Sequence, residues 1–328
     1  MTNELFLFIV ILFIGLFFCF YKLNNDRVYF GFTLTLFVVF SIVTRFSGFD
    51  IDMHTYANAL QYSSMSVYYL KEPVYWLSSR YVYSVLDSPE LTFLFFDFLS
   101  ILIILKSSKK LDLPQYFPYL FLLFFPTVMG FNNIFRQFLS SVILLYSWSI
   151  ILSEGRTKKT FIVFLMSGFT HNAAFLFAPL ITVFKGSLKS NLIKFFAFSF
   201  GILLALPWAI NTKSFSDTGS VPVEAFIMVV FLFYLLQLLT NRFLLIGFQA
   251  RFFAFLNYLL FLLILSSITM GSAQSKRIGM FVLVLILVPS VRLIEDKFKH
   301  KTLVRVIFYI VIVMPTLLFS SSRSFLLT

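Results

Sequence analysis

The acidic residues of this chain are concentrated in one polar stretch that runs from Arg45 to Glu90. Five of the 14 Asp and Glu residues lie there, among them Asp50, Asp52 and Glu72. A carboxylate can act as a general base toward a hydroxyl group, or it can bind a divalent cation. Because 59% of the chain is hydrophobic, this concentration indicates either a solvated loop or a reactive site. Both interpretations stay open for Asp50 and Asp52.

Glu72 and His171 also have a functional and a structural interpretation. Glu72 comes directly before Pro73, so it is either a base or simply the residue that precedes a helix with proline in its first turn. His171 lies inside an apolar segment, where an ionisable side chain is a candidate functional residue. Its neighbours Thr170 and Asn172 could equally satisfy a histidine that only packs. The sequence therefore leaves four candidate bases.

Two arginines, Arg136 and Arg277, are expected at the ends of apolar helices with no carboxylate nearby in the sequence. The planar guanidinium group suits the oxygens of a phosphate. The alternative is an arginine whose stem lies in lipid while its head reaches the headgroups. Arg45 and Tyr56 join these candidate binding residues, and Tyr56 follows Asp52 by one helical turn.

A break in an apolar run precedes Arg136. Pro126 and Gly130 interrupt this run just before the sequence FNNIFRQF. Irregular backbone at membrane depth is tolerated only inside protein or beside a water-filled cavity. We expect Asn132 and Arg136 to lie one turn apart on one helical face. The side chains expected to face the cavity are Asn132, Asn133, Arg136 and Gln137.

The composition excludes a soluble globular domain. The 328 residues include 48 Phe, only 12% are charged, and the mean hydropathy is +0.92. The apolar runs have helical length and lack the alternation of a β-barrel, so the sequence predicts an all-α polytopic transmembrane helical bundle. We count about ten to twelve membrane segments, with a hairpin of two short helices over 160–184. No repeat divides residues 1–328, which we treat as one integral membrane domain.

The positive charges predict the orientation of this bundle. Lys and Arg favour cytoplasmic loops, and they cluster at Lys106–Lys110 and at Arg292–Lys301. The segment 45–90 then lies on the outer face, where Trp76 and several tyrosines suit interfacial helices. The net charge of +12 is explained by these loops, so we expect no nucleic-acid partner.

No cofactor is predicted from the sequence. It contains no metal-ligand spacing, no nucleophile elbow and no glycine-rich phosphate loop. We therefore expect neither a metal ion nor another cofactor. Cys19 is the single cysteine and lies in the first apolar run, which excludes a disulfide within the chain.

Five short motifs follow one another along the chain: R-F-x-x-x-D-x-D-x-x-x-Y at Arg45–Tyr56, E-P-V-Y-W at Glu72–Trp76, N-N-x-x-R-Q at Asn132–Gln137, F-T-H-N-A-A around His171, and K-R-I-G-M-F from Lys276. In this order they resemble the EpsG-like family of polysaccharide polymerases, a relative of the Wzy O-antigen and capsule polymerases.

The resemblance implies an integral membrane glycosyltransferase of the GT-C kind. Its donor and acceptor would be oligosaccharide repeat units linked to undecaprenyl pyrophosphate, in contact with membrane lipid and with a chain-length regulator as a partner. It would lie in the bacterial inner (plasma) membrane, with its active site facing the periplasm or outside. There are two alternatives. A flippase for lipid-linked oligosaccharides would also need a cationic cavity, and a glycan ligase would use the same donor.

Within that interpretation, cations bind the diphosphate and one acid or imidazole acts as base. We expect Arg136 and Arg277 at the diphosphate, because charge grows on this leaving group as the glycosyl bond breaks. The residues expected to help bind the substrate are Arg45, Tyr56, Asn132 and Gln137. The base would be one of Asp50, Asp52, Glu72 and His171.

Overall fold

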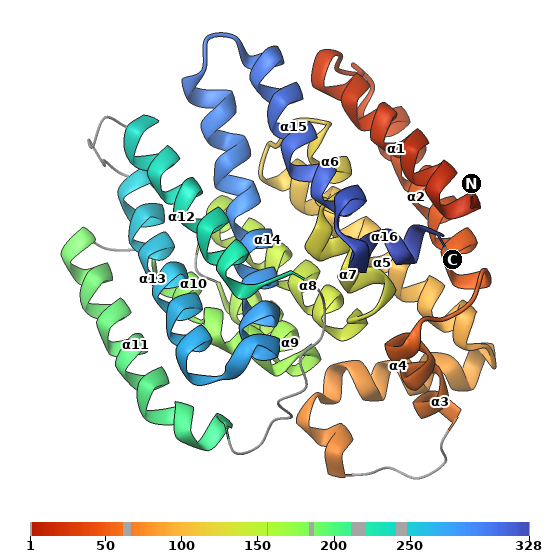
Figure 1. The fold of residues 1–328 in the computed structure, drawn as a ribbon, viewed down its shortest axis with the longest axis horizontal. Coiled ribbons are helices and arrows are strands. Elements are labelled where there is room, and N and C mark those ends of the chain that lie inside the picture. Colours follow the sequence, from red (N-terminus) through yellow and green to blue (C-terminus); the bar gives the residue numbers. More distant parts are fainter. Residues whose placement is uncertain are drawn as a thin grey trace.

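The computed structural model describes residues 2–61, 67–155, 157–183, 187–210, 221–240 and 248–327. These residues form helices and turns and contain no strand, so the prediction of an all-helical fold is confirmed. The helices stand side by side as a bundle, with the amino and carboxyl termini close together (Figure 1). Thr2 Oγ1 donates a hydrogen bond to the Leu326 carbonyl and ties the two ends.

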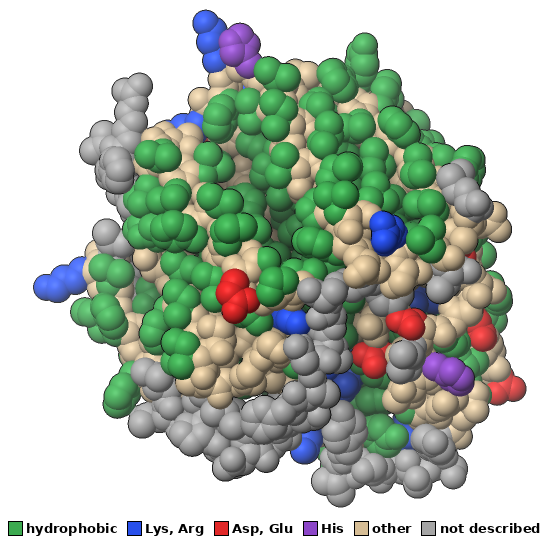
Figure 2. Space-filling model, in the orientation of Figure 1, with side chains coloured by type: hydrophobic (Ala, Val, Ile, Leu, Met, Phe, Trp, Pro, Cys, Tyr) green, Lys and Arg blue, Asp and Glu red, His purple; other side chains and the backbone are tan. Residues whose placement is uncertain are grey.

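Seven helices within the described residues are long and apolar enough to cross a bilayer, which makes the chain a multi-pass membrane protein. They are α1 (Asn3–Phe20), α2 (Asp26–Phe46), α5 (Pro89–Lys110), α8 (Phe135–Glu154), α12 (Val223–Thr240), α14 (Gly271–Lys297) and α15 (Lys301–Leu318). Large apolar side chains cover much of their outer surface, as lipid contact requires (Figure 2). The higher count of ten to twelve segments stays a prediction.

The remaining helices are shorter, or contain shorter apolar stretches. Two of the expected membrane segments are divided. The apolar run that leads to the expected break at Pro126 is itself interrupted, because the backbone is extended at Phe124. The segment expected to form a hairpin over 160–184 is divided at His171, where the backbone is extended. Residue 184 lies outside the described residues, and the hairpin stays a prediction. The further elements are α3 (Ile51–Gln61), η1 (Val67–Lys71), α4 (Pro73–Leu86), α6 (Phe117–Leu123), α7 (Phe125–Asn132), α9 (Lys158–Thr170), η2 (Asn172–Phe177), α10 (Pro179–Val183), α11 (Leu188–Ile210), α13 (Phe248–Thr269) and α16 (Ser320–Leu327).

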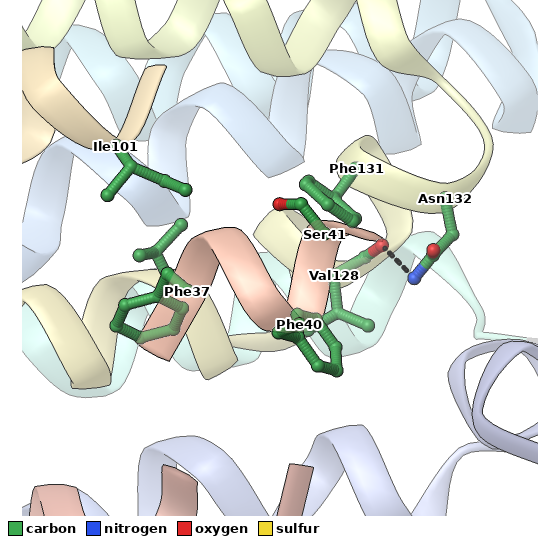
Figure 3. A pocket seen from close by; sticks show the side chains of 8 residues that line it. Phe37, Phe40, Ser41, Ile101, Val128, Phe131 and Asn132 are labelled. Carbon is green, nitrogen blue, oxygen red and sulfur yellow. Dashed lines mark hydrogen bonds between the residues drawn. The ribbon is translucent and has the colours of Figure 1, made fainter. Parts of the chain in front are cut away.

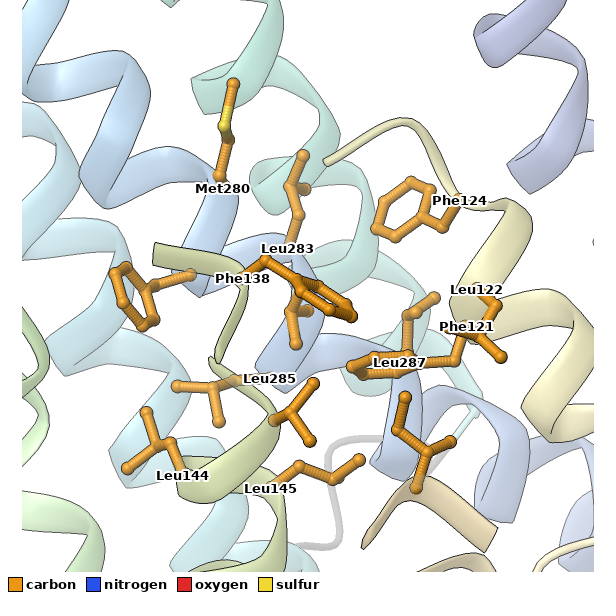
Figure 4. Close-up of a cluster of buried hydrophobic side chains, with 14 of the residues drawn as sticks. Phe121, Leu122, Phe124, Phe138, Leu144, Leu145, Met280, Leu283, Leu285 and Leu287 are labelled. Carbon is orange, nitrogen blue, oxygen red and sulfur yellow. The ribbon is translucent and has the colours of Figure 1, made fainter. Parts of the chain in front are cut away.

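Helix α14 forms the centre of the bundle. Of the 18 consecutive residues of α14 that are most apolar, 89% are buried inside the protein. The helix contacts α7, α8, α12, α13 and α15. Figure 4 shows Leu283 and Leu287 of α14 among Phe121 of α6 and Phe138 and Leu145 of α8. A helix that is apolar on every side must be surrounded by other helices. Its first turns, which carry Arg277, are thereby held in one place.

A buried ion pair links four helices near one end of the bundle. Arg45 at the end of α2 is 2% exposed, and Asp97 in α5 is fully buried. Arg45 donates through Nε to Asp97 Oδ2 at 2.7 Å and through Nη2 to Oδ1 at 2.9 Å. Nη2 also donates to the Phe131 carbonyl of α7 at 2.9 Å. The guanidinium lies 4.3 Å from the Phe131 ring centroid and 4.9 Å from that of Phe135, in α8. It therefore joins α2, α5, α7 and α8.

The described parts of the polar segment 45–90, residues 45–61 and 67–90, lie at one end of the bundle. Helices α3 and α4 are at the bottom of Figure 1, and the loop between α14 and α15 is at the top. On the face shown in Figure 2, acidic side chains gather in the lower half. The prediction that segment 45–90 and the loop at 292–301 lie at opposite ends agrees with this arrangement.

We expect Arg45→Met to destabilise the protein strongly, because it leaves the Asp97 charge buried without its partner. Breaking a buried pair in this way costs about 3–5 kcal/mol. The double variant Arg45→Met/Asp97→Leu removes both charges and should recover at least half of that loss. Thermal unfolding in detergent measures both effects. A double variant as unstable as Arg45→Met would contradict this account of the pair.

Candidate active site

Glu72 is the residue on which the candidate site is built. It is 7% exposed and precedes α4, but its side chain makes no capping hydrogen bond. Pro73 occupies the first helical position, where it supplies no N–H group and fixes the backbone for helix entry. The Glu72 carboxylate turns away from its own helix toward α8 and η2. Glu72 therefore does precede a helix with proline in its first turn, and its role as a base stays a prediction.

Three groups from distant parts of the chain meet at the Glu72 carboxylate. Arg136 Nη1 forms an ion pair with Oε2. The backbone N–H of Asn172 donates to Oε1 at 3.2 Å, and His171 Nδ1 lies 3.6 Å from the same oxygen. The side chains of Glu72 and Arg136 are 9% and 17% exposed. The carboxylate is therefore largely removed from solvent and held from two sides.

The tautomer of His171 follows from its backbone contact. The N–H of Ala173 donates to His171 Nδ1 at 3.2 Å. Because Nδ1 acts as the acceptor there, the proton of the neutral ring is on Nε2. The contact between His171 Nδ1 and Glu72 is then not a hydrogen bond. In this tautomer the ring carries a single N–H, on Nε2.

The groups that contact Glu72 lie where helices are interrupted. Helix α9 ends at Thr170, and extended backbone at His171 (φ −150°, ψ 119°) leads into η2. The first N–H groups of a helical turn have no internal partner, which leaves the Asn172 N–H available for Glu72. Arg136 is the second residue of α8, directly after irregular backbone at Asn133 and Ile134. Each interruption therefore supplies a polar contact.

Aromatic rings from α3 and α4 flank Arg136. Its guanidinium carbon lies 5.2 Å from the Tyr56 ring centroid and 5.3 Å from that of Trp76. The two rings are themselves 6.2 Å apart. Arg80 donates to the Ala59 carbonyl at 3.1 Å and ties α4 to α3. Cation–π contacts of this kind hold an arginine without neutralising it.

Asp52 and Arg277 lie beside this group. Asp52 is half-buried on α3, and burial raises the pKa of its carboxyl above the ordinary value. The positive charge of Arg277 opposes that rise, the Asp50 carboxylate adds to it, and Arg136 again opposes it. Arg277 is in the second turn of α14. Both arginines are thus close enough to act on the charge of Asp52.

Arg277 differs from Arg136 in having no acidic partner. Within the described residues, no hydrogen bond or ion pair engages its guanidinium, and Nε is buried. Its backbone carbonyl accepts from Gln137 Nε2 at 2.8 Å, which links α14 to α8. A half-buried cation without a carboxylate is suited to an anionic ligand.

Two of the candidate binding residues lie apart from this group. Arg45 is engaged by Asp97 and by the Phe131 carbonyl, which favours a role in the architecture. The expectation that Asn132 and Arg136 share one helical face is wrong, because α7 ends at Asn132 and α8 begins at Phe135. Asn132 donates to the Val128 carbonyl at 3.1 Å and lines an apolar crevice with Phe37, Phe40 and Phe131 (Figure 3).

Sequence reasoning missed Asp97 and the part played by the Asn172 backbone. Asp97 lies in the apolar run of α5, and an acid inside a membrane segment is a signal that could have drawn attention to it. No sequence signal marks the Asn172 N–H. The expected break at Pro126 and Gly130 is also displaced: both residues are inside α7, and the irregular backbone is at Phe124 and at Asn133–Ile134.

No set of three or more His, Cys, Asp or Glu side chains within the described ranges could hold a metal ion. The expectation that the protein works without a metal stays a prediction. The ionisable groups that do meet are a carboxylate, an imidazole and one guanidinium group, with Arg277 close enough to act on the charge of Asp52. Such a set can accept a proton and bind an anion.

Long apolar helices with these ionisable groups buried at one end define a multi-pass membrane protein with a polar site. The sequence pattern of the EpsG family matches residues 28–327, nearly the whole chain, and the protein therefore belongs to the EpsG family. This confirms the resemblance stated above and associates the protein with polysaccharide synthesis. Comparison with curated proteins and with solved structures gives no match.

Proposed function

We propose that this protein polymerises oligosaccharide repeat units linked to undecaprenyl pyrophosphate into a surface polysaccharide. Membership of the EpsG family supports the substrate class. The observation that carries the proposed chemistry is the buried Glu72 carboxylate, held by Arg136 and the Asn172 N–H. Arg277, which has no acidic partner within the described residues, lies on the neighbouring helix α14. A base and an anion site therefore occur together.

In the proposed reaction, Glu72 is the general base. Its carboxylate takes the proton of a hydroxyl group on the acceptor sugar. The hydroxyl oxygen then forms a bond to the anomeric carbon of the donor. The bond from that carbon to the phosphate oxygen breaks, and its electron pair leaves with undecaprenyl pyrophosphate. Asp52 is the second candidate for the base, since it lies on α3 within the field of the same two arginines.

The arginines stabilise the leaving group in this proposal. Negative charge grows on the diphosphate as the glycosyl bond breaks, and fixed cations at that position lower the barrier. Arg277 is the first contact because no carboxylate among the described residues engages its guanidinium. Arg136 has five N–H donors, so it can hold Glu72 and reach a phosphate oxygen together. With the leaving group bound in this way, the reaction needs no metal ion.

The proposal includes the setting of the reaction. We place the protein in the bacterial inner membrane with segment 45–90 outside, and we relate its bundle to glycosyltransferases of the GT-C kind. A chain-length regulator is the proposed protein partner. These assignments are supported by the family and by the distribution of Lys and Arg over the two ends of the bundle.

We expect Arg136→Lys and Arg277→Lys to reduce polymer formation strongly without loss of inserted protein. Lysine keeps the charge but lacks the planar fork that binds phosphate in a bidentate way. Losing such a contact costs about 2–4 kcal/mol in the transition state, roughly 30- to 1000-fold in rate. The measurement is surface polysaccharide per cell at equal protein level.

The matched control for these variants is Arg27→Lys. Arg27 is exposed and lies in the first turn of α2, at the opposite end of this helix from Arg45, so this variant should make polymer normally. Near wild-type polymer from Arg136→Lys and Arg277→Lys would show that the two cations only anchor their helices, because a lysine serves equally well for that purpose.

We expect a membrane-impermeant thiol reagent to label Ser84→Cys from outside and to leave Lys106→Cys unlabelled in intact cells. Both positions are exposed. The background is Cys19→Ser, which removes the one native cysteine, and permeabilised cells provide the control for accessibility of both sites. The reverse labelling pattern would place the candidate active site on the cytoplasmic side and contradict the proposed topology.

A further inference from the structure

Two side-chain oxygens beside the arginines are buried and have no partner among the described residues. They are Oε1 of Gln137 and Oδ1 of Asn133. Gln137 is 4% exposed, while Asn133 is half-buried. Buried polar atoms in folded proteins are almost always hydrogen-bonded, so exceptions at one place need a physical explanation. These two atoms accept hydrogen bonds and cannot donate them.

The orientation of the Gln137 amide is determined by its other contact. Nε2 donates to the Arg277 carbonyl at 2.8 Å. A carbonyl oxygen can only accept, so the nitrogen must face Arg277 and the oxygen must point to the other side of the amide. The free acceptor is therefore not an ambiguity of the amide group. It is a consequence of the link between α8 and α14.

Both acceptors belong to residues that flank Arg136 in the chain. Asn133 and Gln137 are separated by four residues across the start of α8, and Arg136 lies between them in the sequence. Gln137 is bonded to the backbone of Arg277 itself. A ligand that filled this place would have to present hydrogen-bond donors within reach of two cations.

A fully ionised diphosphate alone does not satisfy that requirement. Its oxygens accept hydrogen bonds and would be repelled by the amide oxygens. Hydroxyl groups, and the N–H of an acylated amino group, are donors. A sugar attached to a diphosphate combines the two kinds of group at adjacent positions. The acceptors and the arginines together are complementary to such a sugar diphosphate.

We propose that Gln137 Oε1 and Asn133 Oδ1 form a subsite for the donor sugar attached directly to the diphosphate, and that they accept hydrogen bonds from its hydroxyl or N–H groups. This inference rests on the proposed function and deepens it. The two residues recognise the sugar, whereas Arg277 recognises the diphosphate. They act in substrate selection and leave proton transfer to Glu72.

The test compares two probes on purified full-length protein in lipid nanodiscs. One is undecaprenyl pyrophosphate, which has no sugar. The other is the lipid-linked repeat unit extracted from the cells that make the polymer. Wild-type protein should bind the repeat unit more tightly. Gln137→Met and Asn133→Leu should each weaken its binding about 5- to 10-fold, the loss of one hydrogen bond, and change undecaprenyl pyrophosphate binding less than about twofold.

Two controls separate this effect from others. Arg277→Gln should weaken both probes, because it removes a contact to the diphosphate. Ser141→Ala, one turn beyond Gln137 on α8, should weaken neither, because the Ser141 hydroxyl donates to the Phe138 carbonyl of its own helix. Asn133→Leu removes an unbonded acceptor, so its thermal stability should not fall. The Asn133→Leu variant therefore tests the subsite in folded protein even if Gln137→Met does not fold.

Two results would overturn the subsite. Equal weakening of both probes by Gln137→Met and Asn133→Leu would mean that these residues only position Arg277. No weakening of either probe would mean that the oxygens meet water alone. If the variants discriminate between the probes as expected but wild-type protein does not lengthen glycan chains, the subsite stands and the proposed polymerase activity falls.

Discussion

The architecture depends on the buried contact that Arg45 makes with Asp97 and with the Phe131 carbonyl. A helix that ends inside a membrane protein leaves carbonyl groups without partners, and lipid cannot supply them. Phe131 is next to the last residue of α7, and Arg45 Nη2 donates to its carbonyl at 2.9 Å. Asp97 binds the same guanidinium through both oxygens. The break between α7 and α8 is thereby stabilised by groups from α2 and α5.

Burying this pair removes two charges from water, and that cost can exceed their mutual attraction. Here the guanidinium gains two bonds to the carboxylate, one to a carbonyl and the faces of Phe131 and Phe135. The pair therefore serves to hold the irregular backbone between α7 and α8 in place more than to raise the net free energy of unfolding. The same break places Arg136 at the start of α8, where it meets Glu72. The candidate site is a consequence of an interruption that the fold must stabilise.

Much of this arrangement could be predicted from the sequence. Long apolar runs are sufficient to predict α1, α2, α5, α8, α12, α14 and α15. An ionisable residue within an apolar or aromatic stretch is a candidate functional residue, and this signal identifies Glu72, Arg136, His171 and Arg277. The partners of these charges could not be predicted. Asp97 lies 52 residues beyond Arg45, and nothing local indicates that these two residues pair. The face shared by Asn132 and Arg136 was wrong for a different reason: irregular backbone at Asn133 and Ile134 separates α7 from α8, so the spacing of one continuous helix does not apply.

The central claim is that the site around Glu72 transfers glycan from a lipid diphosphate. The most direct measurement places purified protein in liposomes with the lipid-linked repeat unit and follows chain length and sidedness together. We expect wild-type protein to lengthen the chains and release undecaprenyl pyrophosphate, and Glu72→Gln to do neither while it remains folded. Movement of the repeat unit across the bilayer without lengthening would identify a flippase. Lengthening at the wild-type rate by Glu72→Gln would contradict the role given to this carboxylate.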